Sequence, residues 1–217
     1  MTVAAAEMQK PRLRGRLHQI AFIVWIPAGT ALVALGRTAL ARTAAAIYSV
    51  CVLTLYGVSA SYHRLPWSPR ARRIMRRLDH SSIFILIAGS YTPLALLALH
   101  HAWRISILAT VWGVALVGVV LKVARIDKMD RLGMVLYIAL GWTALIALPE
   151  ILHNLSTASA VLLFAGGILY TVGAVFFILH RPDPNPRVFG YHEVWHSMVI
   201  GGTLCHYVMV MLLAVGH

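Results

Sequence analysis

Charged residues are scarce in this sequence. Asp, Glu, Lys and Arg together make up 12% of the 217 residues, whereas they make up about 25% of an ordinary soluble domain. Hydrophobic residues make up 59%, and the mean hydropathy is +0.76. This composition excludes an ordinary soluble globular domain and predicts a membrane protein.

Cysteine and acidic residues are few as well. Cys51 and Cys205 each lie in an apolar run, which excludes a disulfide framework and a Cys-rich metal site. We expect both to pack as small hydrophobic residues. Only 7 Asp and Glu oppose 19 Lys and Arg, which leaves a net charge of +12. Because the cations fall between apolar runs and no nucleic-acid motif is present, we expect contacts with anionic lipid head groups and no nucleic-acid partner.

Long apolar runs make up most of the sequence. Backbone groups in lipid must bond within their own segment and strand-like alternation is absent, so the sequence predicts an all-α, seven-transmembrane helical bundle in the cell membrane. Each span needs roughly 20 residues. We expect a basic N-terminal tail, 1–17, and a single transmembrane domain, 18–217. The predicted spans lie near 18–36, 43–63, 80–99, 103–122, 132–149, 158–179 and 191–215.

The first span also has features of a signal peptide. A basic start precedes it, and Ala-Leu-Ala at 39–41 resembles a cleavage site. The apolar stretch is longer than a typical signal core, and the next span follows at once. We therefore expect a retained helix.

Lys and Arg alternate in density between the two ends of the predicted bundle. Sixteen of the 19 lie in the N-terminal tail and the second, fourth and sixth connections. The other three, Arg37, Arg42 and Arg104, lie in the first and third connections, and the fifth connection and the C-terminal tail have none. The positive-inside rule then predicts a cytoplasmic N-terminus and a C-terminus outside.

This topology gives five polar residues the same depth in the membrane. His63 ends the second span on the cytoplasmic side, and Ser59 lies one turn deeper. Asp79 lies at the cytoplasmic mouth of the third span, and His192 and His196 occupy the first two turns of the seventh. The three histidines and Asp79 fall within about 10 Å of one another along the membrane normal, which is about two helical turns.

Such a set is typical of a metal site. His192 and His196 are four residues apart on one helix, so both rings can face one point, and His63 can add a third nitrogen. Three His with an open position describe catalytic zinc, whose bound water has a pKa of about 7. Asp79 could bond to that water or act as general base, and Ser59 could orient a ligand or bind an anionic intermediate. The site requires the second, third and seventh spans to be neighbours, which the sequence does not decide.

Most other histidines lie near the ends of spans. We expect them to be interfacial residues that reach water. His206 lies about 15 Å farther along its helix than the pair, which is too far for the same metal. It either lines a polar cavity or makes a buried helix contact. The interfacial set is His18, His80, His100, His101, His153, His180 and His217.

Two further stretches have more than one interpretation. The Arg-rich segment 64–77 is expected to be a topogenic loop that contacts anionic head groups. The stretch Gly-Ser-Tyr-Thr-Pro at 89–93 is expected to distort its helix, either lining a cavity or packing as a kink.

The stretch His-Glu-x-x-His at 192–196 has the spelling of a zinc-protease motif. Such a protease would need a downstream ligand, but the later His206 and His217 are too far away and no later Asp or Glu exists. We expect Glu193 to lie off the His face, near the cytoplasmic surface. The protease interpretation is therefore set aside.

Three stretches together resemble the hemolysin III family, the bacterial branch of the progestin and adiponectin Q receptors, in a superfamily with the alkaline ceramidases. They are SASYHRLPW at 59–67, RRLDHSSIFILIAGSYTPL at 76–94 and HEVWHSMVIGG at 192–202. The resemblance implies a cytoplasmic-side zinc held by three histidines, His63, His192 and His196. It also implies Asp79 near the metal-bound water, Ser59 alongside, and hydrolysis of a lipid amide or ester.

The sequence departs from the wider superfamily pattern in two places. Tyr56 stands where some members have Glu, and Met75 and Arg76 stand where some have Ser. Three functions stay open, because family membership alone does not establish activity. They are a zinc-dependent lipid hydrolase, a hemolysin-type permeabilising protein, and a receptor-like regulator of lipid composition with structural zinc. The sequence does not decide the oligomeric state.

Overall fold

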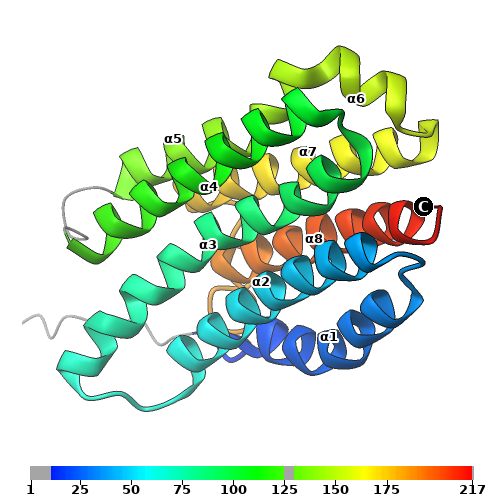
Figure 1. The fold of residues 1–217 in the computed structure, drawn as a ribbon. Coiled ribbons are helices and arrows are strands. Elements are labelled where there is room, and N and C mark those ends of the chain that lie inside the picture. Colours follow the sequence, from blue (N-terminus) through cyan, green and yellow to red (C-terminus); the bar gives the residue numbers. More distant parts are fainter. Residues whose placement is uncertain (1–10, 125–129, 217) are drawn as a thin grey trace, which may run out of the picture.

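The computed structural model describes residues 11–124 and 130–216, and every regular element in this part of the chain is a helix (Figure 1). Seven segments are long and apolar enough to cross a membrane, the fifth combining three short helices over Gly133–Asn154. This confirms the predicted all-α seven-transmembrane bundle. The helices are α1 (Arg16–Leu35), α2 (Ala39–Arg64), α3 (Pro69–Ala98), α4 (His101–Ala124), α5 (Asp130–Gly141), η2 (Thr143–Ala147), α6 (Leu148–Asn154), α7 (Thr157–Leu179) and α8 (Tyr191–Gly216).

Helix α3 begins eleven residues before the predicted third span, so the expectation of a loop over 64–77 is wrong for most of that segment. Ser68 caps the helix, with its side-chain oxygen accepting a hydrogen bond from Ala71 N at 3.3 Å. Pro69 follows at the first helical turn, where its missing N–H costs nothing. The Arg-rich residues therefore form the first turns of a helix that continues directly into the membrane span.

The fifth span is broken, and one tyrosine bridges the break. Tyr91, from the stretch 89–93, donates a hydrogen bond to Gly141 O at 2.6 Å and accepts one from Ala144 N at 2.8 Å. These two groups lie on either side of the change from α5 to η2. Of the two interpretations of 89–93, the structure supports packing, because all five residues are buried within continuous helix α3.

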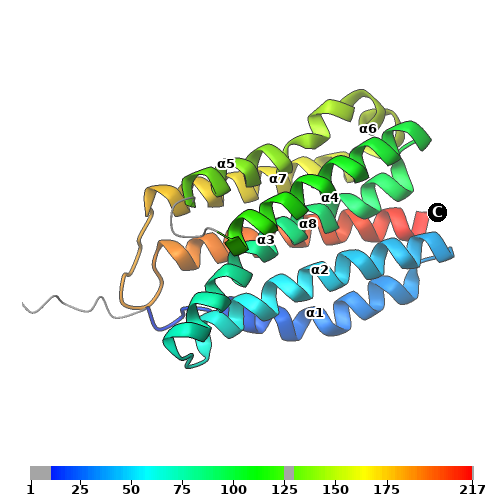
Figure 2. The same cartoon turned by 60° about the vertical axis from the view of Figure 1, so that its left-hand side comes forward.

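Helix α8 lies at the centre of the bundle. It packs along α7 and also contacts α1, α2 and α3. Both ribbon views show α8 running between α7 and the α1–α2 pair (Figures 1 and 2). The second, third and seventh spans are therefore neighbours, as the predicted metal site requires.

The two ends of the bundle differ in charge. The described start of the chain and the α2–α3 and α7–α8 connections lie at one end, and the C-terminus lies at the other (Figure 1). The first end therefore collects the Arg-rich connections, which the positive-inside rule assigns to the cytoplasm. That orientation stays a prediction.

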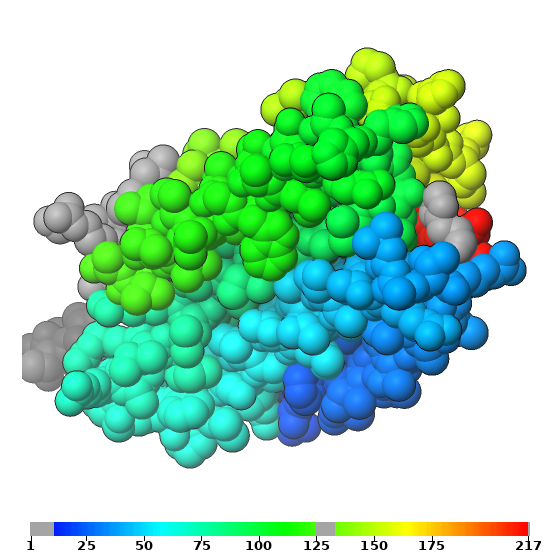
Figure 3. All heavy atoms as spheres, viewed as in Figure 1, coloured from blue at the N-terminus to red at the C-terminus, as the bar shows by residue number. Residues whose placement is uncertain are grey.

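The outer surface is apolar, as a lipid-facing surface must be. Helices α1 to α4 form one continuous face (Figure 3), and Leu116 and Val117 on α4 are 65% and 57% exposed. Cys51 is buried as predicted and packs beside Gly89, where an added Cβ would lie 2.5 Å from Cys51 Cβ. Cys205 is half-buried.

Candidate metal centre

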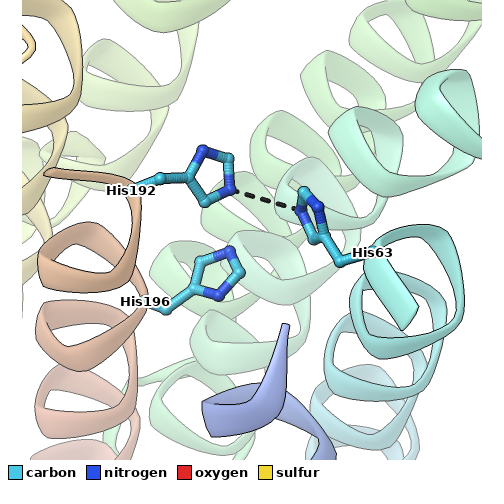
Figure 4. Close-up of side chains that lie close together, drawn as sticks. All are labelled: His63, His192 and His196. Atoms are coloured by element: carbon cyan, nitrogen blue, oxygen red, sulfur yellow. Dashed lines mark hydrogen bonds between the residues drawn. The ribbon is translucent and has the colours of Figure 1, made fainter. Parts of the chain in front are cut away.

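Three histidines from two helices converge at the basic end of the bundle (Figure 4). His63 comes from the last turn of α2, and His192 and His196 come from the first two turns of α8. Each offers one ring nitrogen, and these nitrogens all lie within 4.8 Å of one another. The rings point into a common space between the two helices (Figure 4).

The donor spacing fits a transition metal such as zinc. The Nε2 atoms of His63 and His192 lie 3.2 Å apart. Two nitrogens on one tetrahedral zinc lie about 3.3 Å apart, because each Zn–N bond is about 2.0–2.1 Å long. His196 is 3% exposed, and its Nδ1 is buried with no hydrogen-bond partner in the described part of the chain. The three donors therefore suit a metal in number and chemistry, and the His63–His192 pair also has the spacing that zinc requires, while zinc itself stays a prediction.

Asp79 and Ser59 lie beside this triad. Asp79 Oδ2 is 3.8 Å from His63 Nε2, and the two side chains are only 14% and 6% exposed. Ser59, one turn deeper on α2, is buried and lies near enough to influence the Asp79 carboxylate. The structure thus brings all five predicted site residues into one cluster, although their roles in binding and catalysis stay predictions.

His18 was expected to reach water, and the structure shows this to be wrong. Its side chain is 3% exposed, and its ring stacks on that of His196 with centroids 3.7 Å apart and planes 11° apart. The ring of Tyr56 lies 5.1 Å away on a tilted plane. One signal in the sequence could have revealed this position, because His18 begins the first span at the same end as the other three histidines.

Glu193 is buried, which corrects the expectation that it lies near the surface. It has no exposed area, and its Oε1 accepts a hydrogen bond from Arg14 Nε at 2.6 Å. Its Oε2 accepts a hydrogen bond from Gly190 N at 2.9 Å, which secures the start of α8 in the manner of a capping box. Both oxygens are thus engaged away from the triad, which agrees with setting the protease interpretation aside.

His206 makes a buried helix contact, the second of its two predicted alternatives. Its Nε2 lies 3.2 Å from Leu163 O on α7, and a Cβ added at Gly166 would lie 2.4 Å from its ring. The other histidines follow the expectation in most cases. His100, His101, His153 and His180 are exposed, His80 is half-buried, and His217 lies outside the described residues.

Comparison with known proteins gives consistent results. The model of the family described as Haemolysin-III related matches residues 6–207. The chain is 34% identical over 197 residues to Hemolysin-3 of Bacillus cereus, covering 89% of this chain and 87% of the relative. It is 35% identical over 169 residues to the Hemolysin-3 homolog of Bacillus subtilis (strain 168), covering 78% and 76%.

A plant protein is also similar. The chain is 28% identical over 183 residues to the Heptahelical transmembrane protein ADIPOR2 of Oryza sativa subsp. japonica, covering 77% of this chain and 80% of that protein. This match supports the link to the adiponectin-receptor branch that the sequence motifs indicate. Together with the seven apolar helices, the comparisons support a multi-pass protein of the cell membrane.

Proposed function

This chain belongs to the Haemolysin-III related family, and from that premise we propose that it is a zinc-dependent hydrolase acting on a lipid amide or ester. One observation carries the proposal. The ring nitrogens of His63, His192 and His196 lie within 4.8 Å of one another, with the Asp79 carboxylate beside them. Three neutral donors and a nearby carboxylate are the usual constituents of a hydrolytic zinc site.

Each residue has a distinct task in this function. A zinc ion held by the three histidines would polarise a carbonyl and lower the pKa of a bound water to about 7. Asp79 would take the proton that this water loses, since its carboxylate lies 3.8 Å from His63 Nε2. Ser59 would hold the Asp79 carboxylate in orientation by donating a hydrogen bond to it. The exposed apolar side chains of the outer surface would place the protein among membrane lipids, the proposed substrate class.

Metal analysis is the first test. We expect the protein purified in mild detergent to contain about one zinc per chain, and the His63→Ala, His192→Ala and His196→Ala variants to lose it. His153→Ala is the matched control, because His153 is exposed at the opposite end of the bundle. A wild-type protein without metal after gentle purification would rule out the proposed function.

Lipid turnover is the second test. Ceramide-type amides and phospholipid esters should be incubated with the zinc-loaded protein and the products identified by mass spectrometry. Asp79→Asn should retain zinc and lose turnover, because the amide cannot accept the proton. If the wild type binds zinc and unfolds at a lower temperature without it, yet hydrolyses neither class, a receptor-like regulator with structural zinc is the better assignment.

A hemolysin-type membrane-permeabilising activity is the second candidate, because a relative that is 34% identical is named Hemolysin-3. This activity predicts dye leakage from vesicles that carry the protein. Leakage that persists in the His196→Ala variant would favour permeabilisation that is independent of the metal site. Leakage that requires all three histidines would instead indicate that permeabilisation results from lipid hydrolysis at the metal site.

Anionic lipids are the proposed partners of the basic end. Arg70 and Arg73 are exposed in the first turns of α3, next to Ile74 and Leu78, which are 49% and 41% exposed. Basic and apolar side chains on one short helical stretch suit a head-group interface. We expect Arg70→Gln/Arg73→Gln to retain less anionic lipid on purification, whereas Arg37→Gln at the opposite end should change nothing.

A further inference from the structure

The segment that leads into the first span, together with the first turn of α1, crosses the basic end of the bundle next to the three histidines. We call residues 11–18 the N-terminal strap. Backbone hydrogen bonds join it to the α7–α8 connection, from Arg12 N to Arg187 O at 3.0 Å and from Leu13 N to Val188 O at 3.1 Å. The strap is therefore anchored on the connection that leads into α8, the helix that bears His192 and His196.

The strap touches the first histidine through Gly15. This glycine has a φ of 77°, a left-handed conformation that side chains disfavour. A Cβ built at Gly15 would lie 2.5 Å from His63 Cβ and 3.3 Å from Arg64 Cγ. The backbone of the strap thus packs directly on the last turn of α2, where His63 begins.

The strap reaches the second histidine through an ion pair. Arg14 Nε donates to Glu193 Oε1 at 2.6 Å, and the two side chains are 19% and 0% exposed. Glu193 follows His192 in the chain, and its other oxygen accepts from Gly190 N. The Arg14 guanidinium therefore holds the first turn of α8 at the position from which His192 projects.

The third histidine is held by ring stacking. His18 lies parallel to His196, with centroids 3.7 Å apart. Both His18 nitrogens are buried without a hydrogen-bond partner in the described residues. A ring nitrogen binds a metal in the plane of its ring, and the His18 and His196 rings face each other instead of sharing a plane, so their nitrogens cannot both point at one ion. This geometry suits His18 to fix the plane of the His196 ring rather than to bind the same ion.

We propose that Arg14, Gly15 and His18 are positioning residues that hold the three histidines in metal-binding geometry. The inference rests on the proposed metal site. Each strap residue acts on a different histidine, Gly15 on His63, Arg14 on His192 and His18 on His196. Residues that orient metal ligands change metal affinity by about 10–100-fold when they are altered.

The test compares two substitutions of similar size in the full-length protein. His18→Phe keeps an aromatic ring that can stack on His196, whereas His18→Leu fills the space without one. Zn²⁺ affinity is measured by competition with a chelating dye, and the visible absorption of the Co²⁺-loaded protein reports the coordination geometry. We expect the Leu variant to bind about 10–100-fold more weakly with an altered Co²⁺ spectrum, and the Phe variant to match the wild type.

Arg14→Ala provides the second arm, with Arg12→Ala as its control because the Arg12 side chain is exposed in the same strap. Arg14→Ala should weaken metal binding and Arg12→Ala should not. Wild-type affinity and spectrum in both His18→Leu and Arg14→Ala would overturn the strap proposal while leaving the metal site intact. Equal losses in His18→Phe and His18→Leu would overturn the stacking role, because the imidazole nitrogen would then be required. A wild type that binds no metal would remove both proposals.

Discussion

His63 and His192, separated by 129 positions in the chain, bring their Nε2 atoms to 3.2 Å from each other. This pair joins the end of α2 to the start of α8 at the basic end of the bundle. Two imidazoles so close can share one proton or one metal ion, and the nearby His196 supplies a third donor that a metal could use. The following predictions start from this cluster and move outward through the bundle.

Metal removal should lower the thermal stability of the wild type. A ligand present at 100 times its dissociation constant stabilises the folded state by about 2.7 kcal/mol. We therefore expect a chelator to lower the melting temperature in detergent, and added Zn²⁺ to restore it. The His192→Ala variant should melt at one temperature with or without chelator, and an equal response of both proteins would argue against this site.

The Arg14–Glu193 pair should behave as a coupled unit in folding. Removing either partner leaves the other without its counter-charge, which costs about 1.5–3 kcal/mol for a partly exposed pair. We expect Arg14→Ala and Glu193→Gln each to lower the melting temperature. The decrease in melting temperature of the double variant should be smaller than the sum of the decreases in the two single variants. Strict additivity in this double-mutant cycle would show that the 2.6 Å contact contributes no coupling energy.

The break in the fifth span should depend on the Tyr91 hydroxyl. Tyr91→Phe removes two hydrogen bonds at once, to Gly141 O and from Ala144 N, and leaves both backbone groups unpaired. The expected cost is about 1–3 kcal/mol. Differential scanning fluorimetry of the purified protein provides the measurement. Tyr62→Phe is the control, since Tyr62 makes its contacts with His63 and Arg72 through its ring.

Two adjacent glycines of α7 should respond differently to the same substitution. A Cβ at Gly166 would lie 2.4 Å from the His206 ring and 3.1 Å from Gly202 O, so Gly166→Ala should push α7 away from α8 and lower the melting temperature. A Cβ at Gly167 meets nothing within 4 Å. Gly167→Ala should be neutral or stabilising by up to about 1 kcal/mol, because alanine favours the helix. Equal effects would show that the α7–α8 contact tolerates a methyl group.

The orientation of the bundle can be tested by labelling. In a background where Cys51 and Cys205 are replaced by Ala, single cysteines are introduced as Pro66→Cys and Ala158→Cys, both at exposed positions. Position 66 lies at the basic end, and position 158 lies at the opposite end. A membrane-impermeant maleimide added to intact cells should label Ala158→Cys and spare Pro66→Cys. The reverse pattern would invert the orientation predicted from the positive charges.

The sequence by itself determined the seven spans and the shared depth of the site residues. It also determined which end of the bundle is rich in Lys and Arg and which end is poor in them. These properties follow from hydropathy and charge along the chain, because both determine where a segment lies along the membrane normal. For that reason His63, Asp79 and His192 could be assigned to one height without any knowledge of packing. The same information could not exclude a wrong lateral arrangement of helices.

The tertiary structure decided which faces of the helices meet. It turned His18 inward onto His196 and buried Glu193 against Arg14, two positions that the sequence predicted incorrectly. It also extended α3 through the Arg-rich segment and broke the fifth span beside Tyr91. Rotation and neighbour choice depend on side chains from distant segments that pack together, and neither hydropathy nor charge along one segment encodes them. Depth in the membrane was thus a property of the sequence, whereas convergence of the three histidines was a property of the fold.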